Sequence, residues 1–272
     1  WGATLLAAKR KLLDRPMHLL VPFIPLSGLL IGLVILQHDL GTAIVMGAIV
    51  LALLWCVGAS WRVMGGIFGI VAIAAGVLVA LNQSRTARIL AFLDPTSDPQ
   101  GVNYQPLRAL YGMASGGWWG VGLGASRQKW GALAEAHSDY VLAIIGEELG
   151  LFGTFTVLAL FLLLGFGGVR IALRSSTFYG RLLAAGITCW FMLQALINVM
   201  VVLGMLPVLG IPLPLVSYGG SALMSNLMGV GILVACARDE PEAKRWLERH
   251  RRSKRPRSRL SAVLTGARAS SK

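Results

Sequence analysis

Residues 129–150, KWGALAEAHSDYVLAIIGEELG, concentrate side chains that could do chemistry. Glu135, His137 and Asp139 alternate along a short polar segment. Glu147 and Glu148 follow where the sequence has become apolar, and charges in such surroundings are costly and usually functional. Because a carboxylate can take a proton from a reacting hydroxyl, the segment predicts a general base. A polar loop whose charges only solvate a helix end is the alternative.

Basic side chains accompany these acids. Five of them fall in the same region of the sequence: Arg85, Arg88, Arg108, Arg127 and Lys129. A glycine-rich run at residues 115–124, SGGWWGVGLG, precedes the last two and could fold tightly around an anion. Guanidinium and ammonium groups pair well with phosphate, so the predicted ligand is a lipid-linked phosphate or diphosphate. Attraction of these residues to anionic lipid headgroups is the alternative.

The composition indicates which elements position this chemistry. With 56% hydrophobic residues, 33 glycines and only 14% charged residues, the chain cannot be an ordinary soluble domain. A membrane span needs about 20 apolar residues, and six runs qualify, centred on residues 17–36, 42–58, 63–81, 143–169, 182–203 and 215–236. Each must be helical, because lipid offers the backbone no hydrogen-bond partner and no run alternates like a barrel strand. We therefore expect an all-α polytopic membrane protein with six spanning helices.

The basic residues also predict orientation, since loops rich in lysine and arginine stay in the cytoplasm. Twenty of the 25 fall on one side of these spans. The chain then divides into the end of a preceding helix with a basic cytoplasmic loop (1–16), three spans (17–81), a large outer loop (82–142), three further spans (143–237) and a basic cytoplasmic tail (238–272). The opening residues read like the last turns of a helix, so we expect an N-terminal truncation.

The tail begins as a short charged helix and becomes basic and serine-rich, so disorder is expected beyond Ser253. On the cytoplasmic side its expected partner is anionic membrane lipid. Despite a net charge of +13, a nucleic-acid partner is not expected.

Six ordered sequence blocks carry a resemblance to a known family. They are QHDLGT at 37–42, RILAFLDP at 88–95, GVGLGASRQKW at 120–130, EAHSDYVLAIIGEELG at 135–150, QALINVMVVLGMLP at 194–207 and PLPLVSYGGSALM at 212–224. In these blocks the chain resembles the SEDS family (shape, elongation, division and sporulation), the multi-spanning peptidoglycan glycosyltransferases. ARDEPEA at 237–243 and the basic tail look closer to the cell-division branch than to the elongation branch.

The resemblance implies a ten-helix fold, of which the six spans here match the last six, and makes the large loop extracellular. It also implies the reaction: a sugar hydroxyl of one lipid II molecule attacks the anomeric carbon of another, and undecaprenyl diphosphate leaves. Asp139 matches the family's essential loop aspartate and is the expected general base, with Glu135 supporting it. The two carboxylates could instead share a divalent cation, Mg or Mn. The expected diphosphate clamp comprises Lys129, Arg127, Arg85 and Arg88.

Supporting roles are expected for residues near the same face: Gln37, Asp39, His137, Glu147, Glu148 and Ser217. Asp39 could orient a basic partner or cap the following helix. One of the two adjacent glutamates could reach the cavity while the other pairs inside the bundle, and the sequence favours neither assignment. His137 is interpreted as a hydrogen-bonding loop residue. Ser217 lies in a proline- and glycine-rich tract that should interrupt helix near the outer surface.

The resemblance further implies partners and a location. They are a class B penicillin-binding protein, which is a transpeptidase that cross-links the strands, and other division proteins at the septum of a bacterial plasma membrane. A transporter that flips lipid II and a non-catalytic division scaffold are the other function classes. The gathering of acids in one outer loop, rather than at the membrane midplane, favours the enzyme.

Overall fold

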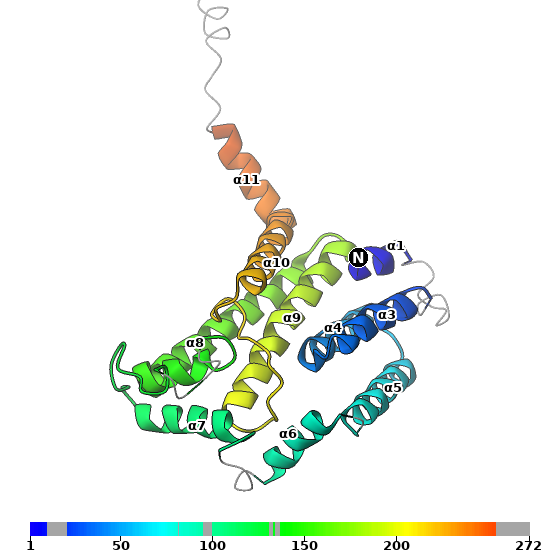
Figure 1. Cartoon of the computed structure of the whole chain (residues 1–272). Helices are drawn as coiled ribbons and strands as arrows, with labels where there is room; N and C mark the ends of the chain where they lie inside the picture. Colours follow the sequence, from blue (N-terminus) through cyan, green and yellow to red (C-terminus); the bar gives the residue numbers. More distant parts are fainter. Residues whose placement is uncertain (10–20, 81, 95–99, 131–132, 134–136, 254–272) are drawn as a thin grey trace, which may run out of the picture.

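The computed structural model describes residues 1–9, 21–80, 82–94, 100–130, 133 and 137–253, and all regular structure in them is α-helical (Figure 1). Six helices occupy the predicted apolar runs: α3 (Phe23–Leu36), α4 (Leu40–Val57), α5 (Trp61–Ala80), α8 (Val141–Arg174), α9 (Phe178–Val202) and α10 (Gly220–Arg238). Of these, α4, α8, α9 and α10 are long and apolar enough to cross a membrane. The apolar stretches of α3 and α5 are shorter, so six spans stays a prediction. The all-α membrane class is confirmed.

Four further helices lie outside the apolar runs: α1 (Gly2–Ala8), α6 (Gln83–Leu93), α7 (Tyr104–Gly116) and α11 (Pro241–Ser253). The region predicted as one large loop therefore contains two helices, α6 and α7. Both have one apolar face on an otherwise polar stretch, which is how helices that lie against a larger structure are patterned. The short helix expected at the start of the tail is α11, and the disorder expected beyond Ser253 lies outside the described residues.

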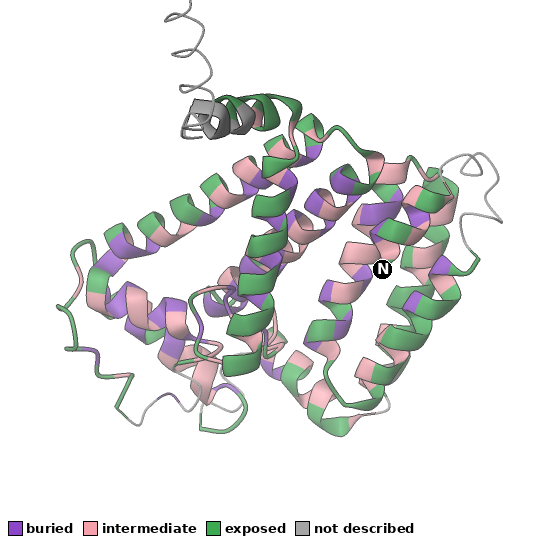
Figure 2. Cartoon of the chain, turned by 90° about the horizontal axis from the view of Figure 1, so that it is seen from above, coloured by how far each residue is buried: buried purple, intermediate pink, exposed green. Residues whose placement is uncertain are grey.

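Helix α9 is the central element. It packs against α1, α4, α7, α8 and α10, and buried residues lie on the facing sides of these helices (Figure 2). One apolar cluster joins α7, α8 and α9, including Leu142, Phe161 and Val202. Large apolar side chains such as Phe155 and Phe166 point outward, as expected for a surface in contact with lipid.

The two ends of the bundle differ. α1 and α11 lie at one end, whereas α6, α7 and the segment between α9 and α10 lie at the other (Figure 1). The first end is the predicted cytoplasmic one, and the second is the predicted outer one. Residues 203–219 are not helical, as the prolines at positions 207, 212 and 214 led us to expect. The chemistry-bearing residues must be assembled at this second end.

Helix α8 is broken near its start. Its 34 residues would span about 51 Å if straight, well beyond a hydrocarbon core of about 30 Å. Gly150 has φ 68° and ψ −164°, a conformation that only glycine adopts readily. The break separates a short outer segment, residues 141–149, from residues 151–174, which alone suffice to cross a membrane. The apolar run predicted at 143–169 is therefore a span preceded by a separate turn of helix.

The glycine-rich run supplies hydrogen-bond partners to the backbone at this break. Two hydrogen bonds of a regular helix, from Leu151 to Glu147 and from Phe152 to Glu148, are replaced. The Val121 and Gly122 amides donate to the Glu147 and Glu148 carbonyls over 2.9 and 3.1 Å. The Leu151 and Phe152 amides donate to the carbonyls of residues 117 and 118 over 2.9 and 3.4 Å. The two carbonyls and two amides that these helical bonds would have joined therefore all have partners.

We predict that Gly120→Ala lowers the free energy of unfolding by roughly 2 kcal/mol or more. Gly120 has φ 80°, and an added Cβ would overlap the Glu148 carbonyl oxygen. The melting temperature of the purified protein in detergent measures the effect. Gly76→Ala in α5 is the control, because nothing lies within 4 Å of its Cβ position. Equal melting of the two variants would contradict the docking of the glycine run on α8.

Candidate functional site

Asp139 lies in the turn that precedes α8, and hydrogen bonds from two other elements fix the backbone there. The side-chain amide of Asn198, 1% exposed near the C-terminal end of α9, donates to the carbonyl oxygens of Asp139 and Ile211 over 2.8 and 2.7 Å. The Ser217 hydroxyl donates to the Ser138 carbonyl over 2.6 Å and accepts from the Leu213 amide over 2.7 Å.

His137 completes this arrangement, since its carbonyl accepts a hydrogen bond from the Tyr218 amide over 2.8 Å. Three successive carbonyls, at residues 137, 138 and 139, are thus held by α9 or by the segment that follows it. All these bonds are made to the backbone carbonyls of residues 137–139. That carboxylate lies beside Gly210, whose Cβ position is 3.6 Å from Oδ2.

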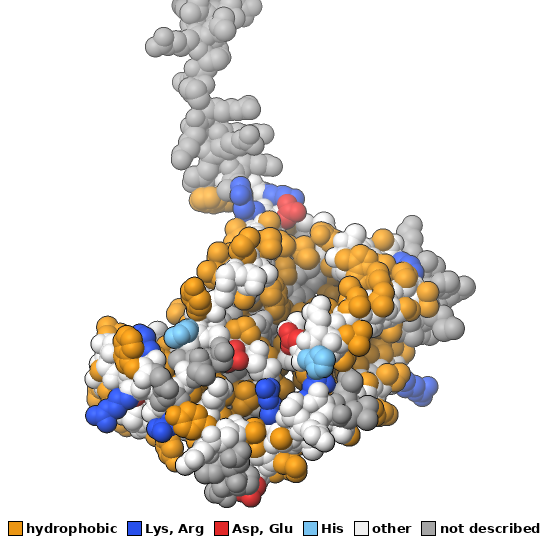
Figure 3. Space-filling model, in the orientation of Figure 1, with side chains coloured by type: hydrophobic (Ala, Val, Ile, Leu, Met, Phe, Trp, Pro, Cys, Tyr) orange, Lys and Arg blue, Asp and Glu red, His pale blue; other side chains and the backbone are white. Residues whose placement is uncertain are grey.

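A second group of charges lies around a small cavity of about 120 Å³. Asp39, Arg85 and Arg88 line it together with Val208 and Leu209 of the segment after α9. Figure 3 shows acidic and basic side chains gathered around a hollow on this face. Asp39 also caps α4, because its carboxylate accepts hydrogen bonds from the Thr42 amide and hydroxyl over 2.9 and 2.6 Å. Gln37, two residues before Asp39, caps the C-terminal end of α3 and is exposed.

Tyr140 connects the two groups. Its ring is fully buried, and burial raises the pKa of its phenol, so the phenol stays protonated at neutral pH. The negative charge of Asp139 raises that pKa further, whereas the positive charge of Arg88 lowers it. Geometry links the two groups as well: Leu209 lines the charged cavity, and the next residue, Gly210, lies beside the Asp139 carboxylate. The predicted base therefore lies next to the cavity that part of the predicted clamp lines.

The two adjacent glutamates have different surroundings. Glu147 is 2% exposed and accepts hydrogen bonds from the Ser126 hydroxyl and from the Arg127 and Gln128 amides, over 2.5, 3.0 and 3.4 Å. These bonds hold residues 126–128, which follow the glycine-rich run, against α8. Glu148 instead faces Lys129, with 4.0 Å between Nζ and Oε1. Glu147 is thus the buried glutamate, and its partners belong to the loop at residues 126–128.

The structure divides the predicted clamp. Arg85 and Arg88 lie on α6 beside Asp39, whereas Lys129 lies against Glu148 and the backbone of Arg127 is held by Glu147. The glycine-rich run does not form the expected anion cradle, because the amides of residues 120, 121 and 122 donate to carbonyls of α7 and α8. The backbone groups opened at Gly150 need hydrogen-bond partners from a segment that can approach α8 closely. The glycines allow that approach, because they have no side chains.

Glu135 lies outside the described residues, so its supporting role stays a prediction. In the part of the chain that the structure describes, no three His, Cys, Asp or Glu side chains are close enough to hold a metal ion. The divalent cation expected between Asp139 and Glu135 therefore stays a prediction.

The sequence analysis missed the polar residues of α9 and the role of Ser126. Gln194 donates to the Pro212 carbonyl over 3.0 Å, one turn before Asn198. Two amide side chains four residues apart in an otherwise apolar helix lie on the same face, and that spacing was the available signal. Ser126 gave no such signal, because its partner Glu147 is 21 residues away.

We predict that Glu147→Gln lowers the free energy of local unfolding of residues 126–128 by about 1–3 kcal/mol. One carboxylate oxygen would be replaced by an NH₂ group, which cannot accept the hydrogen bonds that this loop donates. Hydrogen exchange of the Arg127 and Gln128 amides should accelerate. Glu148→Gln is the matched control, since no described hydrogen bond joins that side chain to the loop backbone. Equal exchange in both variants would contradict the anchoring role of Glu147.

Comparison with known proteins gives the family. The model of the FtsW/RodA/SpoVE family, described as cell cycle proteins, matches residues 1–242. A protein named probable peptidoglycan glycosyltransferase FtsW from Mycobacterium tuberculosis is 42% identical over 243 residues, covering 89% of this chain and 46% of that protein. A protein of the same name from Geobacter metallireducens is 40% identical over 213 residues, covering 78% and 57%. The chain thus spans about half the length of these relatives.

Solved structures agree with the sequence relatives. A structure described as "Structural coordination of polymerization and crosslinking by a peptidoglycan synthase complex" is similar with TM-score 0.68 and 29% identity, over 88% of this chain and 69% of that one. The crystal structure of the rod shape determining protein RodA from Thermus thermophilus is similar with TM-score 0.56 and 27% identity, over 88% and 64%. The chain therefore belongs to the FtsW/RodA/SpoVE family, the SEDS proteins that its sequence blocks resemble.

Proposed function

We propose that this protein polymerises lipid II into glycan strands as a peptidoglycan glycosyltransferase. The observation that carries the proposal is the position of Asp139 beside Gly210, next to the cavity that Asp39, Arg85 and Arg88 line at one end of the bundle. A base and a diphosphate-binding group must lie close together for this reaction. The names of the FtsW relatives support the same activity.

In the proposed reaction, a sugar hydroxyl of one lipid II molecule attacks the anomeric carbon of another. The Asp139 carboxylate accepts the hydroxyl proton as the new glycosidic bond forms. The bond from the anomeric carbon to the diphosphate oxygen breaks, and its electron pair leaves with undecaprenyl diphosphate. The backbone bonds that hold residues 137–139 support the role of Asp139, because a base is effective only when its position is fixed.

Arg85 and Arg88 would stabilise the departing diphosphate, since a guanidinium can bind two phosphate oxygens at once. Lys129 would join them by exchanging Glu148, 4.0 Å away, for a phosphate oxygen. A divalent cation bound through Asp139 and Glu135 would add positive charge at the same place.

The partners belong to the same proposal. We infer a class B penicillin-binding protein beside this chain, because a similar solved structure is a peptidoglycan synthase complex that couples polymerization with crosslinking. The FtsW names of the relatives favour a cell-division role, with other division proteins and a septal location in the plasma membrane. The basic residues at the α1 and α11 end support an active site on the outer face.

We predict that Asp139→Asn reduces glycan strand formation from purified lipid II by at least 100-fold, because the amide cannot accept the proton. Gel analysis of strands made by the full-length protein with its penicillin-binding partner measures this. Arg62→Leu is the control, since Arg62 lies at the opposite end of α5 from α6.

The outcomes separate the function classes. Equal polymerisation by the wild type and Asp139→Asn would refute the site assignment. If lipid II binds but the folded wild type makes no strands, the enzyme proposal fails. A flippase would then move lipid II across vesicle membranes, whereas a scaffold would not.

A further inference from the structure

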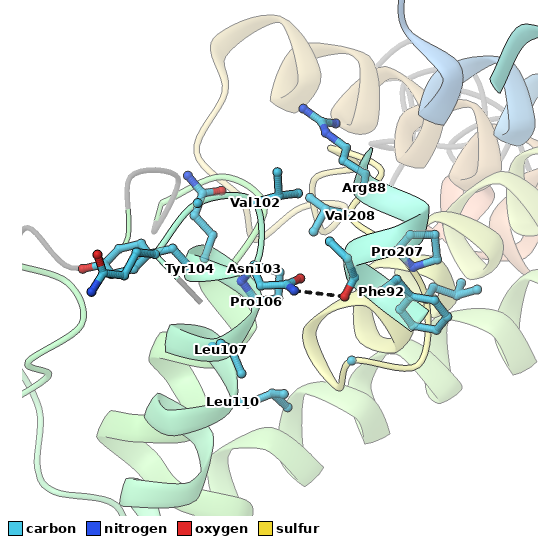
Figure 4. Close-up of a pocket in the computed structure, with 16 residues that line it drawn as sticks. Arg88, Phe92, Val102, Asn103, Tyr104, Pro106, Leu107, Leu110, Pro207 and Val208 are labelled. Atoms are coloured by element: carbon cyan, nitrogen blue, oxygen red, sulfur yellow. Dashed lines mark hydrogen bonds between the residues drawn. The ribbon is translucent and has the colours of Figure 1, made fainter. Parts of the chain in front are cut away.

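The charged cavity beside Asp39 continues into two larger ones along the same face. It shares Arg88, Pro207 and Val208 with a cavity of about 390 Å³ between α6, α7 and the segment after α9 (Figure 4). That cavity in turn shares Gln100, Tyr104 and Leu107 with one of about 490 Å³. The three cavities therefore adjoin one another, and together we call them the groove, which begins at the candidate diphosphate-binding arginines.

The middle of the groove has fixed walls. Asn103 is 5% exposed, and its side-chain amide donates to the carbonyls of Ala91 and Asp94 over 3.0 and 3.3 Å. These bonds hold the end of α6 against the start of α7. Phe92, Val102 and Leu107 supply apolar lining, and a volume of about 390 Å³ lies within the usual range for ligand sites. A ligand would therefore find a preformed groove.

The far end of the groove carries an arginine between two tyrosines. Tyr104, Arg108 and Tyr111 are spaced four and three residues apart on α7 and so share a face. The guanidinium carbon of Arg108 lies 5.1 Å from the centroid of the Tyr104 ring. Within the described residues Arg108 forms no salt bridge, so its fork of donors stays available to a ligand.

We propose that this end of the groove, the Tyr104–Arg108–Tyr111 face, binds a carboxylate of the peptide stem of lipid II. The inference rests on the proposed function and identifies the part of the substrate that this face takes. A carboxylate and a phosphate would both suit a guanidinium. The diphosphate has its own arginines at the other end, and the apolar and amide-bearing walls between the two ends suit a peptide.

The test compares lipid II with free stem carboxylates and lipid II whose stem carboxylates are amidated. Binding of each to the full-length protein in detergent gives two dissociation constants. The wild type should bind the free-acid form about tenfold more tightly, as expected for a charge-assisted hydrogen bond. Arg108→Leu should reduce this ratio to about one, and Arg62→Leu, at the opposite end, should keep it.

Arg108→Lys keeps the charge but loses the two-pronged geometry, so it should give an intermediate ratio. If Arg108→Leu melts at a lower temperature than the wild type, the ratio measured for Arg108→Lys is used instead to decide the test. Two results would overturn the proposal: equal affinity of the wild type for both forms, or a variant that weakens both forms by the same factor. The second result would assign Arg108 to the diphosphate.

Strand formation measured on the same preparations keeps the two proposals separate. If no strands form but Arg108→Leu removes the preference, the peptide subsite stands and the polymerase proposal fails. If strands form and the variant keeps the preference, only the subsite proposal fails.

Discussion

The exchange of four backbone hydrogen bonds between the glycine-rich run and the break in α8 is the contact on which the candidate site depends. The break sets the direction of residues 141–149, and Asp139 lies two residues before Val141. The same contact brings Ser126 and Arg127 within reach of Glu147. Lipid offers no partner to the backbone groups that the break opens, and these hydrogen bonds supply them.

Helix α9 supplies the second constraint. Asn198 and Gln194 bind carbonyls of the segment that follows their own helix, and Asn198 also holds the carbonyl of Asp139. Hydrogen bonds in such a low-dielectric interior are electrostatically stronger than the same bonds in water. The candidate base is thus held by α8 from one side and by α9 from the other, and both helices belong to the membrane bundle rather than to the loop.

Much of this arrangement could be predicted from residue types. Long apolar runs predicted the helices, and the acid beside an apolar run predicted the position of Asp139 before α8. The break at Gly150 could not be predicted, because glycine within an apolar run is common in spanning helices. The pairing of Glu147 with residues 126–128 depends on contacts 19 to 21 residues apart, which local patterns do not encode. α6 and α7 were missed because their apolar faces are short and interrupted by charges.

The break also has a consequence for the order of events during synthesis. Residues 117–122 leave the ribosome before α8 does, so their partners do not yet exist when they reach the outer side. The four hydrogen bonds between residues 117–122 and α8 can therefore form only once α8 has been made. The outer loop cannot reach its folded form before the span that follows it in the sequence.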